Sequence, residues 1–125
     1  MTSDPDCLFC KIVSGAIPSN RVYEDDDIIA FRDINPGAPT HILVVPRTHI
    51  ASIAEATEAN APLIAKLLLT ASKIAADEHV EQRGYRLVIN TGKDGGQSVF
   101  HLHVHLLAGR ALAWPPSLPV LITNR

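Results

Sequence analysis

The sequence predicts an α+β fold in which an antiparallel sheet carries one long helix on one face. The chain has 125 residues, enough for one domain with a single core and too few for two. Short β-branched and aromatic segments precede a long amphipathic segment, and two further strand-like segments follow it. Because the order is three strands, a helix and two strands, with connections short enough for hairpins, we expect a five-stranded sheet.

The first half of the chain contains three predicted strands. Segments 21–24 and 28–32 flank three aspartates, a pattern typical of a β-hairpin. The run Asn-Pro-Gly-Ala-Pro at 35–39 then interrupts regular structure, because proline removes backbone donors and glycine permits positive φ. Residues 42–45 are continuously apolar, which predicts a strand buried on both faces. A short apolar segment at 8–13 precedes the hairpin.

Apolar residues three and four positions apart predict a long helix in the middle of the chain. Asn60 suits the N-cap, Pro62 suits the first turn, and Gly84 is expected to end the helical stretch. The apolar stripe that would face the sheet consists of Leu63, Ile64, Leu67, Leu68, Ala71, Ile74 and Ala75.

A glycine-rich loop at 92–97 separates the two strands predicted after the helix, at 85–91 and at about 99–107. The last strand reads His-Leu-His-Val-His-Leu-Leu from residue 101. Side chains on a strand alternate between its faces, so its apolar residues are expected in the core. The opposite face would then carry three imidazoles, from His101, His103 and His105.

The composition excludes several classes of protein. Hydrophobic residues make up 46% of the chain and charged residues 19%, which is ordinary for a globular domain. The net charge is −2 and no basic face is visible, so nucleic acid is not an expected partner. No apolar run approaches the roughly 20 residues that span a bilayer, and no secretory signal opens the sequence. We therefore expect no membrane partner and a cytoplasmic location.

The row of histidines is better suited to phosphate chemistry than to one metal ion. At about 3.3 Å per residue, His101 and His105 would lie roughly 13 Å apart, too far to share a zinc ion. A solvated strand face is the simpler alternative, although such faces usually carry Thr, Lys, Glu or Arg. A neutral imidazole can attack phosphorus when its other ring nitrogen is held as a donor. The central His103 is the best-placed nucleophile, with Ser98 and the glycine-rich loop nearby.

The only two cysteines of the chain are Cys7 and Cys10, spaced as Cys-x-x-Cys. In a reducing compartment such a pair indicates metal ligands or a redox pair rather than a structural disulfide.

These motifs resemble the histidine triad (HIT) family, and most closely its Hint branch of nucleotide-binding phosphoramidases. The triad itself is His-x-His-x-His followed by two apolar residues. The approach at 95–101, the exit Gly109-Arg110 and Trp114-Pro115-Pro116, and the upstream segments 31–36 and 39–49 are also similar to the family. The resemblance covers about residues 7–116 of a single domain spanning 1–125, and the tail 117–125 departs from it.

The resemblance implies a five-stranded antiparallel sheet with one long helix, a short N-terminal helix and a sheet that continues across a homodimer. It also implies hydrolysis of nucleoside 5′-phosphoramidates, with adenosine or a related purine, through a covalent nucleotidyl-histidine on His103. The catalytic group would be His41, Ser98, His101, His103 and His105. The nucleotide would be bound by Leu8, Phe9, Ile12, Phe31, Asp33, Ile34, Asn90, Gln97, Ser98, Val99, His103 and His105.

Some bacterial-type members of this family carry Cys-x-x-Cys at the same place and bind a structural zinc. The resemblance implies Cys7, Cys10, His49 and His101 as ligands here, a closed tetrahedral set typical of structural zinc. If His101 holds zinc, it cannot also protonate the leaving group, and that role falls to Ser98, His105 or water.

The sequence is also compatible with two other functions. One is hydrolysis of dinucleoside polyphosphates, as in the Fhit branch of the family, although the Trp114-Pro115-Pro116 exit favours Hint. The other is a nucleotide-binding or scaffold protein whose activity is incidental. Comparing turnover of a nucleoside phosphoramidate with that of a dinucleoside polyphosphate would distinguish the two enzymes. Nucleotide binding without turnover of either substrate would indicate a scaffold.

Overall fold

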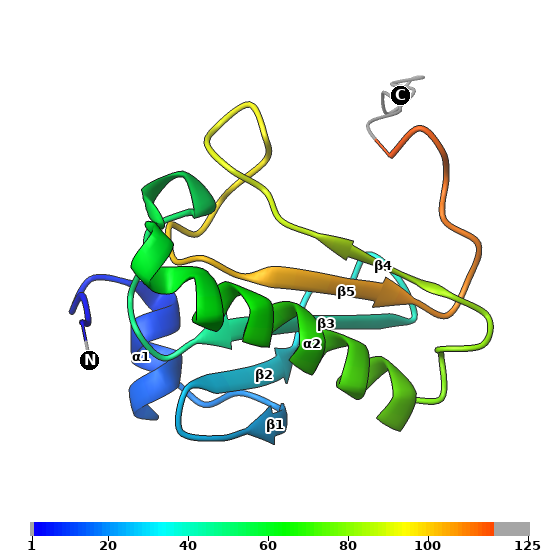
Figure 1. Cartoon of the computed structure of the whole chain (residues 1–125). Coiled ribbons are helices and arrows are strands. Elements are labelled where there is room, and N and C mark those ends of the chain that lie inside the picture. The colour runs from blue at the N-terminus through cyan, green and yellow to red at the C-terminus, as the bar shows by residue number, and fades with distance from the viewer. Residues whose placement is uncertain (1, 117–125) are drawn as a thin grey trace.

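A computed structural model describes residues 2–116 of the chain. These residues form one antiparallel sheet with a long helix across one face and a short helix near one end (Figure 1). No helix of this part of the chain has the length and apolar character that a membrane span requires. The predicted α+β class is confirmed, whereas the tail 117–125 lies outside the described residues. The elements are α1 (Leu8–Ser14), β1 (Arg21–Glu24), β2 (Ile28–Arg32), β3 (Thr40–Pro46), two 3₁₀ turns (Ile53–Glu55 and Glu58–Asn60), α2 (Ala61–Asp77), β4 (Tyr85–Val88) and β5 (Val104–Ala108).

The five strands lie in the order β1-β2-β3-β5-β4, and every neighbouring pair is antiparallel. β3 is therefore the central strand, and β1 and β4 are the two edges. Opposite residues of antiparallel strands share a face. Leu43 pairs with His105 and His41 pairs with Leu107, which places His41 and His105 on the same face of the sheet.

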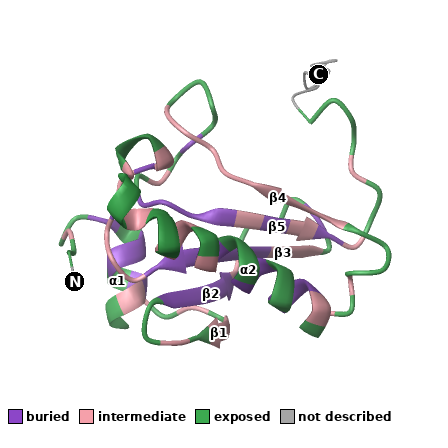
Figure 2. Cartoon of the chain, viewed as in Figure 1, coloured by how far each residue is buried: buried purple, intermediate pink, exposed green. Residues whose placement is uncertain are grey.

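The sheet is buried on both faces along β3, as its continuous apolar sequence predicted (Figure 2). Ile42 and Val44 belong to the core cluster that includes the apolar side of α2. Leu43 and Val45 belong to a second cluster with Phe9 of α1. The face away from α2, which also carries His105, is thus partly covered by α1.

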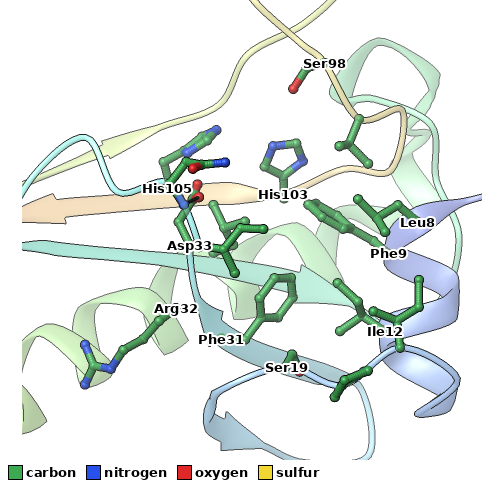
Figure 3. A pocket seen from close by; sticks show the side chains of 16 residues that line it. Leu8, Phe9, Ile12, Ser19, Phe31, Arg32, Asp33, Ser98, His103 and His105 are labelled. Carbon is green, nitrogen blue, oxygen red and sulfur yellow. Dashed lines mark hydrogen bonds between the residues drawn. The ribbon is translucent and has the colours of Figure 1, made fainter.

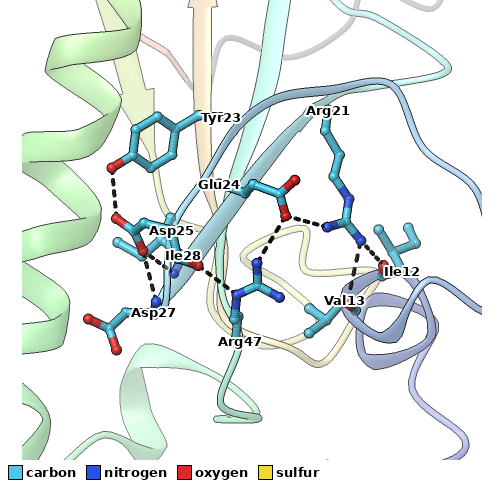
Figure 4. A network of polar contacts seen from close by, with 9 residues as sticks. All are labelled: Ile12, Val13, Arg21, Tyr23, Glu24, Asp25, Asp27, Ile28 and Arg47. Carbon is cyan, nitrogen blue, oxygen red and sulfur yellow. Dashed lines mark hydrogen bonds and ion pairs between the residues drawn. The ribbon is translucent and has the colours of Figure 1, made fainter.

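A network of polar contacts orders the β1–β2 hairpin, and Arg21 of β1 links this network to α1 (Figure 4). The Asp25 carboxylate accepts hydrogen bonds from the backbone N–H groups of Asp27 and Ile28, both at 2.8 Å. The Arg21 guanidinium pairs with Glu24 and also donates to the Ile12 carbonyl at the end of α1. Lys or Arg near a helix C-terminus satisfies its last carbonyls. This contact fixes the end of the short helix.

The amphipathic stripe predicted for α2 is confirmed, and Leu67, Ala71, Ile74 and Ala75 are buried. The predicted end at Gly84 is wrong, because α2 ends at Asp77. His79 adopts a left-handed conformation, with φ of 61°. Its N–H donates to the Ala76 carbonyl and the next N–H donates to Ala75, which is the Schellman pattern. A histidine thus occupies the position where glycine is usual, so no residue type at this position indicated the end of the helix.

The last two strands are shorter than predicted, since β4 ends at Val88 and β5 begins at Val104. The expected strand at 99–107 is therefore wrong over its first half. Leu102 N–H donates to the Ile50 carbonyl, outside the sheet, at 2.6 Å. Leu102, Val104 and Leu106 enter the core as predicted. Of the three triad histidines, only His105 lies on a strand. The rings of His103 and His105 lie beside each other, with centroids 4.9 Å apart, and Phe9 packs against both His101 and His103.

The helix offers a matched test of this core. Leu67 is 1% exposed in the core, whereas Leu69 on the same helix is 71% exposed. We expect Leu67→Ala to lower the free energy of unfolding by about 2–5 kcal/mol, because it leaves a cavity under the helix. Leu69→Ala should change it by no more than about 0.5 kcal/mol. Equal effects in urea titrations of the two variants would contradict the packing described.

Candidate functional site

A cleft of about 320 Å³ lies between α1, the end of β2 and the segment that leads into β5 (Figure 3). Ser98 and His103 lie toward one end of it, and Ile12 and Ser19 lie toward the other (Figure 3). Its apolar lining is Leu8, Phe9, Ile12, Ile17, Pro18, Phe31, Ile34, Leu43 and Val99. Its polar lining is Ser19, Arg32, Asp33, Asn35, Ser98, His103 and His105.

The structure brings ten of the twelve predicted nucleotide-binding residues to this cleft. Asn90 and Gln97 do not line it. Gln97 is buried, its amide N–H groups donate to the carbonyls of Ala51 and Val99, and its oxygen accepts from Gly92 N–H. Gln97 thus braces the glycine-rich loop from behind. The residues that the prediction missed are Ile17, Pro18, Ser19, Arg32, Asn35 and Leu43; of these, Leu43 could have been found from its alternation with Ile42 on β3.

His103 has one ring nitrogen held and the other free. Its Nδ1 lies 2.7 Å from the carbonyl oxygen of His101, and a carbonyl can only accept, so the ring proton is on Nδ1. Nε2 then carries the lone pair. The Phe9 ring packs edge-on against this imidazole, with centroids 5.0 Å apart. Burial lowers the pKa of His103, although the hydrogen bond to the His101 carbonyl opposes this shift. The lowered pKa favours the neutral ring.

His105 and His41 form a hydrogen-bonded pair beside His103. His41 Nε2 lies 2.9 Å from His105 Nδ1 and 3.4 Å from a carboxylate oxygen of Asp33. Burial, followed by repulsion from His103 and His41, lowers the pKa of His105 to about 4. Burial also lowers the pKa of His41, although Asp33 opposes the shift. Both rings are therefore neutral near pH 7.

The remaining triad histidine, His101, lies in a separate group with Cys7, Cys10 and His49. A tetrahedral zinc ion, at about 2.0 Å from nitrogen and about 2.3 Å from sulfur, spaces two nitrogens about 3.3 Å apart and a nitrogen and a sulfur about 3.5 Å apart. Here the two Nδ1 atoms are 3.2 Å apart, and three of the four sulfur–nitrogen distances are 3.3, 3.4 and 3.5 Å. The four predicted residues thus form a closed site that fits zinc.

A hydrogen bond from the second ring nitrogen of His101 orients this ligand, as is usual for histidines that bind a metal. His101 Nε2 donates to the Pro46 carbonyl at 2.8 Å, which leaves Nδ1 unprotonated and facing the thiols. Burial lowers the pKa of His101 to about 4, so the ring is neutral as a ligand must be. The two cysteines are free thiols rather than a disulfide. His101 therefore supplies a metal ligand through its ring and supports His103 through its carbonyl.

The HIT domain family model matches residues 14–112 of the chain. The chain belongs to the HIT family. A HIT-like protein of Synechococcus elongatus is 56% identical over 111 residues, which cover 89% of this chain and 96% of the relative. A maize protein named "14 kDa zinc-binding protein" is 49% identical over 115 residues, which cover 90% of this chain and 89% of the relative.

The fold is also that of solved HIT proteins. The crystal structure of a HIT family hydrolase from Legionella pneumophila superposes with a TM-score of 0.88 at 50% sequence identity, over 89% of this chain and 99% of that one. The five-stranded sheet, the long helix and the short N-terminal helix that the family resemblance implied are thus confirmed.

The metal site leads to a direct prediction. The purified chain should hold one zinc ion per molecule, and Cys10→Ser and His49→Ala should lose it and melt at a lower temperature, because the ion stabilises only the folded state. The control is His79→Asn, since His79 is exposed and asparagine tolerates its left-handed backbone. Metal analysis and thermal melting provide the readouts. If chelation left the melting temperature unchanged, the site would not be structural.

Proposed function

We propose that this HIT protein hydrolyses nucleoside 5′-phosphoramidates, with a purine base and most simply adenosine, through a covalent nucleotidyl-histidine on His103. The observation that carries the proposal is the lone pair on His103 Nε2, left by the hydrogen bond from Nδ1 to the His101 carbonyl at 2.7 Å. This atom belongs to a ring that lines the cleft and is favoured in its neutral form. A neutral, oriented imidazole is a competent nucleophile toward phosphorus.

The lining of the cleft supports a nucleoside and a single phosphate. Leu8, Phe9, Ile12 and Phe31 offer an apolar slot for a base, and Ile34 extends it. In our proposal, Asp33 accepts hydrogen bonds from the ribose hydroxyls. Ser98, His105 and the backbone at Val99 hold the phosphate oxygens. Gln97 acts through the loop that carries Ser98, and we assign it and Asn90 a supporting place near the phosphate.

The charge of the cleft favours a phosphoramidate over a dinucleoside polyphosphate. The only cationic side chain among the lining residues is Arg32, and its guanidinium is paired with Glu78 at 2.8 Å. Figure 3 draws Arg32 directed away from His103 and Ser98. A polyphosphate chain carries several negative charges and would need cationic partners. A phosphoramidate carries one charge at phosphorus, which neutral donors can meet.

The reaction has two steps. His103 Nε2 attacks phosphorus and the P–N bond breaks, while the leaving nitrogen takes a proton from water and departs as an amine. The Nδ1 proton of His103 stays hydrogen-bonded to the His101 carbonyl. Water then attacks the same phosphorus, the bond from Nε2 to phosphorus breaks, and a nucleoside 5′-monophosphate is released. His101, held as a zinc ligand, takes no part in proton transfer.

We propose zinc as the ion of the Cys7, Cys10, His49 and His101 site, in agreement with the name of the maize relative. When bound, the ion supplies a structural cross-link between α1 and the segment that carries the triad. Phe9 lies between the two cysteines in sequence and packs against His103. Loss of zinc is therefore expected to weaken nucleotide binding as well as stability.

We also propose that two copies form a homodimer through their sheets. β4 is an edge strand, and an exposed edge is usually covered by another segment or chain. Trp114, which follows the sheet, is 79% exposed and lies near the Arg86 side chain of β4. In the dimer this segment would reach toward the partner's site.

His103→Ala should abolish turnover of a nucleoside 5′-phosphoramidate by several orders of magnitude, because no other ring occupies its place. The variant should still fold and bind the nucleoside monophosphate, and His79→Asn should keep full activity. The wild-type protein should hydrolyse the phosphoramidate faster than a dinucleoside polyphosphate in the same assay. Normal turnover by His103→Ala would be fatal to the proposal, and binding without turnover by the wild type would favour a scaffold role.

A further inference from the structure

A backbone amide in the Asn-Pro-Gly-Ala-Pro loop contacts the histidine behind the triad. Gly37 N–H donates to His41 Nδ1 at 2.9 Å. A backbone N–H can only donate, so Nδ1 must carry a lone pair. This excludes the doubly protonated ring and one of the two neutral tautomers. The single proton of His41 is therefore on Nε2.

The tautomer of His41 determines that of His105. His41 Nε2–H faces His105 Nδ1 at 2.9 Å. Two N–H groups cannot point at each other at that distance, so His105 Nδ1 must be the acceptor. A neutral His105 then has its proton on Nε2. Among residues 2–116 no group forms a hydrogen bond with this nitrogen, and the nitrogen is not buried. Its N–H is therefore available to a ligand in the cleft that His105 lines.

The same reasoning excludes a second metal site. The ligand atoms of Asp33, His41 and His105 lie within 4.8 Å of one another, close enough to hold an ion. A metal bound to His41 Nε2 would require the ring proton on Nδ1, where Gly37 N–H already points. The three side chains are thus a hydrogen-bonded chain rather than a ligand set.

We propose that Gly37 is a positioning residue: through His41 it holds His105 as a fixed hydrogen-bond donor to the phosphate, so that His105 does not supply the leaving-group proton. This inference rests on the proposed function. To give up its Nε2 proton and stay neutral, His105 would have to take one at Nδ1 from His41. His41 could not be reprotonated on Nδ1 while the Gly37 bond persists, and would be left as an anion.

Water and Ser98 remain as sources of the proton of the leaving amine. We assign it to water, because a Ser98 alkoxide would itself have to be reprotonated by water. As the P–N bond breaks, its electron pair takes a proton from a water molecule, and the hydroxide that remains attacks phosphorus in the second step. The bond from His103 Nε2 to phosphorus then breaks and the ring returns to its starting form. Atoms and charge balance without any net proton from His105, whose N–H stabilises the phosphate oxygens in both steps.

Nuclear magnetic resonance of the zinc-loaded, ¹⁵N-labelled wild-type protein tests the chain of tautomers without any mutation. Ring ¹⁵N shifts should place the proton on Nε2 of His41 and of His105, and on Nδ1 of His103. Scalar couplings through the hydrogen bonds should link the Gly37 nitrogen to His41 Nδ1, and His41 Nε2 to His105 Nδ1. A proton on Nδ1 of His105, or of His41, would overturn the inference.

Two variants of His105 test its role in turnover. His105→Gln offers an amide N–H near the place of Nε2 but cannot transfer a proton, whereas His105→Ala removes the donor. We expect kcat of the alanine variant to fall by about 10²–10³, as for the loss of one oxyanion donor, and the glutamine variant to recover at least tenfold of that loss. If both variants lost activity equally, as a missing general acid predicts, the inference would fail while His103 remained the nucleophile. If the wild type did not turn over phosphoramidates, the proposed function would fail, and the resonance data would still decide the tautomers.

Discussion

The reaction that we propose depends on one interaction, the hydrogen bond from His103 Nδ1 to the carbonyl oxygen of His101. It fixes the proton of the ring and leaves one lone pair in the cleft. The carbonyl is itself held, because the ring of His101 belongs to the metal group and donates to the Pro46 carbonyl. In our proposal, the metal site lies behind the nucleophile His103 and stabilises its orientation through the His101 carbonyl.

The fold places this interaction on the sheet face opposite α2. β3 is buried on both sides, so one face packs on the long helix while the other supports α1 and the cleft. The cleft has an apolar end and an end rich in neutral donors, and its single cationic side chain is engaged elsewhere. These features are the basis of our proposal that the ligand has a flat apolar part and one weakly charged phosphate.

Much of the fold and of the metal site could be predicted from local patterns. The stripe on α2, the apolar run of β3 and the Cys7 and Cys10 pair each express a constraint that the sequence carries directly. The path of residues 99–103 could not be predicted, because alternation continues through Leu102 although its N–H binds Ile50 outside the sheet. The end of α2 was hidden because His79 takes a conformation that usually marks glycine. The Gly37 contact was hidden because any residue except proline supplies that N–H.

The most direct test of the central claim is mass spectrometry of the protein mixed briefly with a nucleoside 5′-phosphoramidate and quenched. The account predicts a transient nucleoside monophosphate adduct on the peptide that contains residues 101–105, localised to His103 and absent from the His103→Ala variant. Rapid turnover with no adduct, or an adduct localised to another residue, would contradict it.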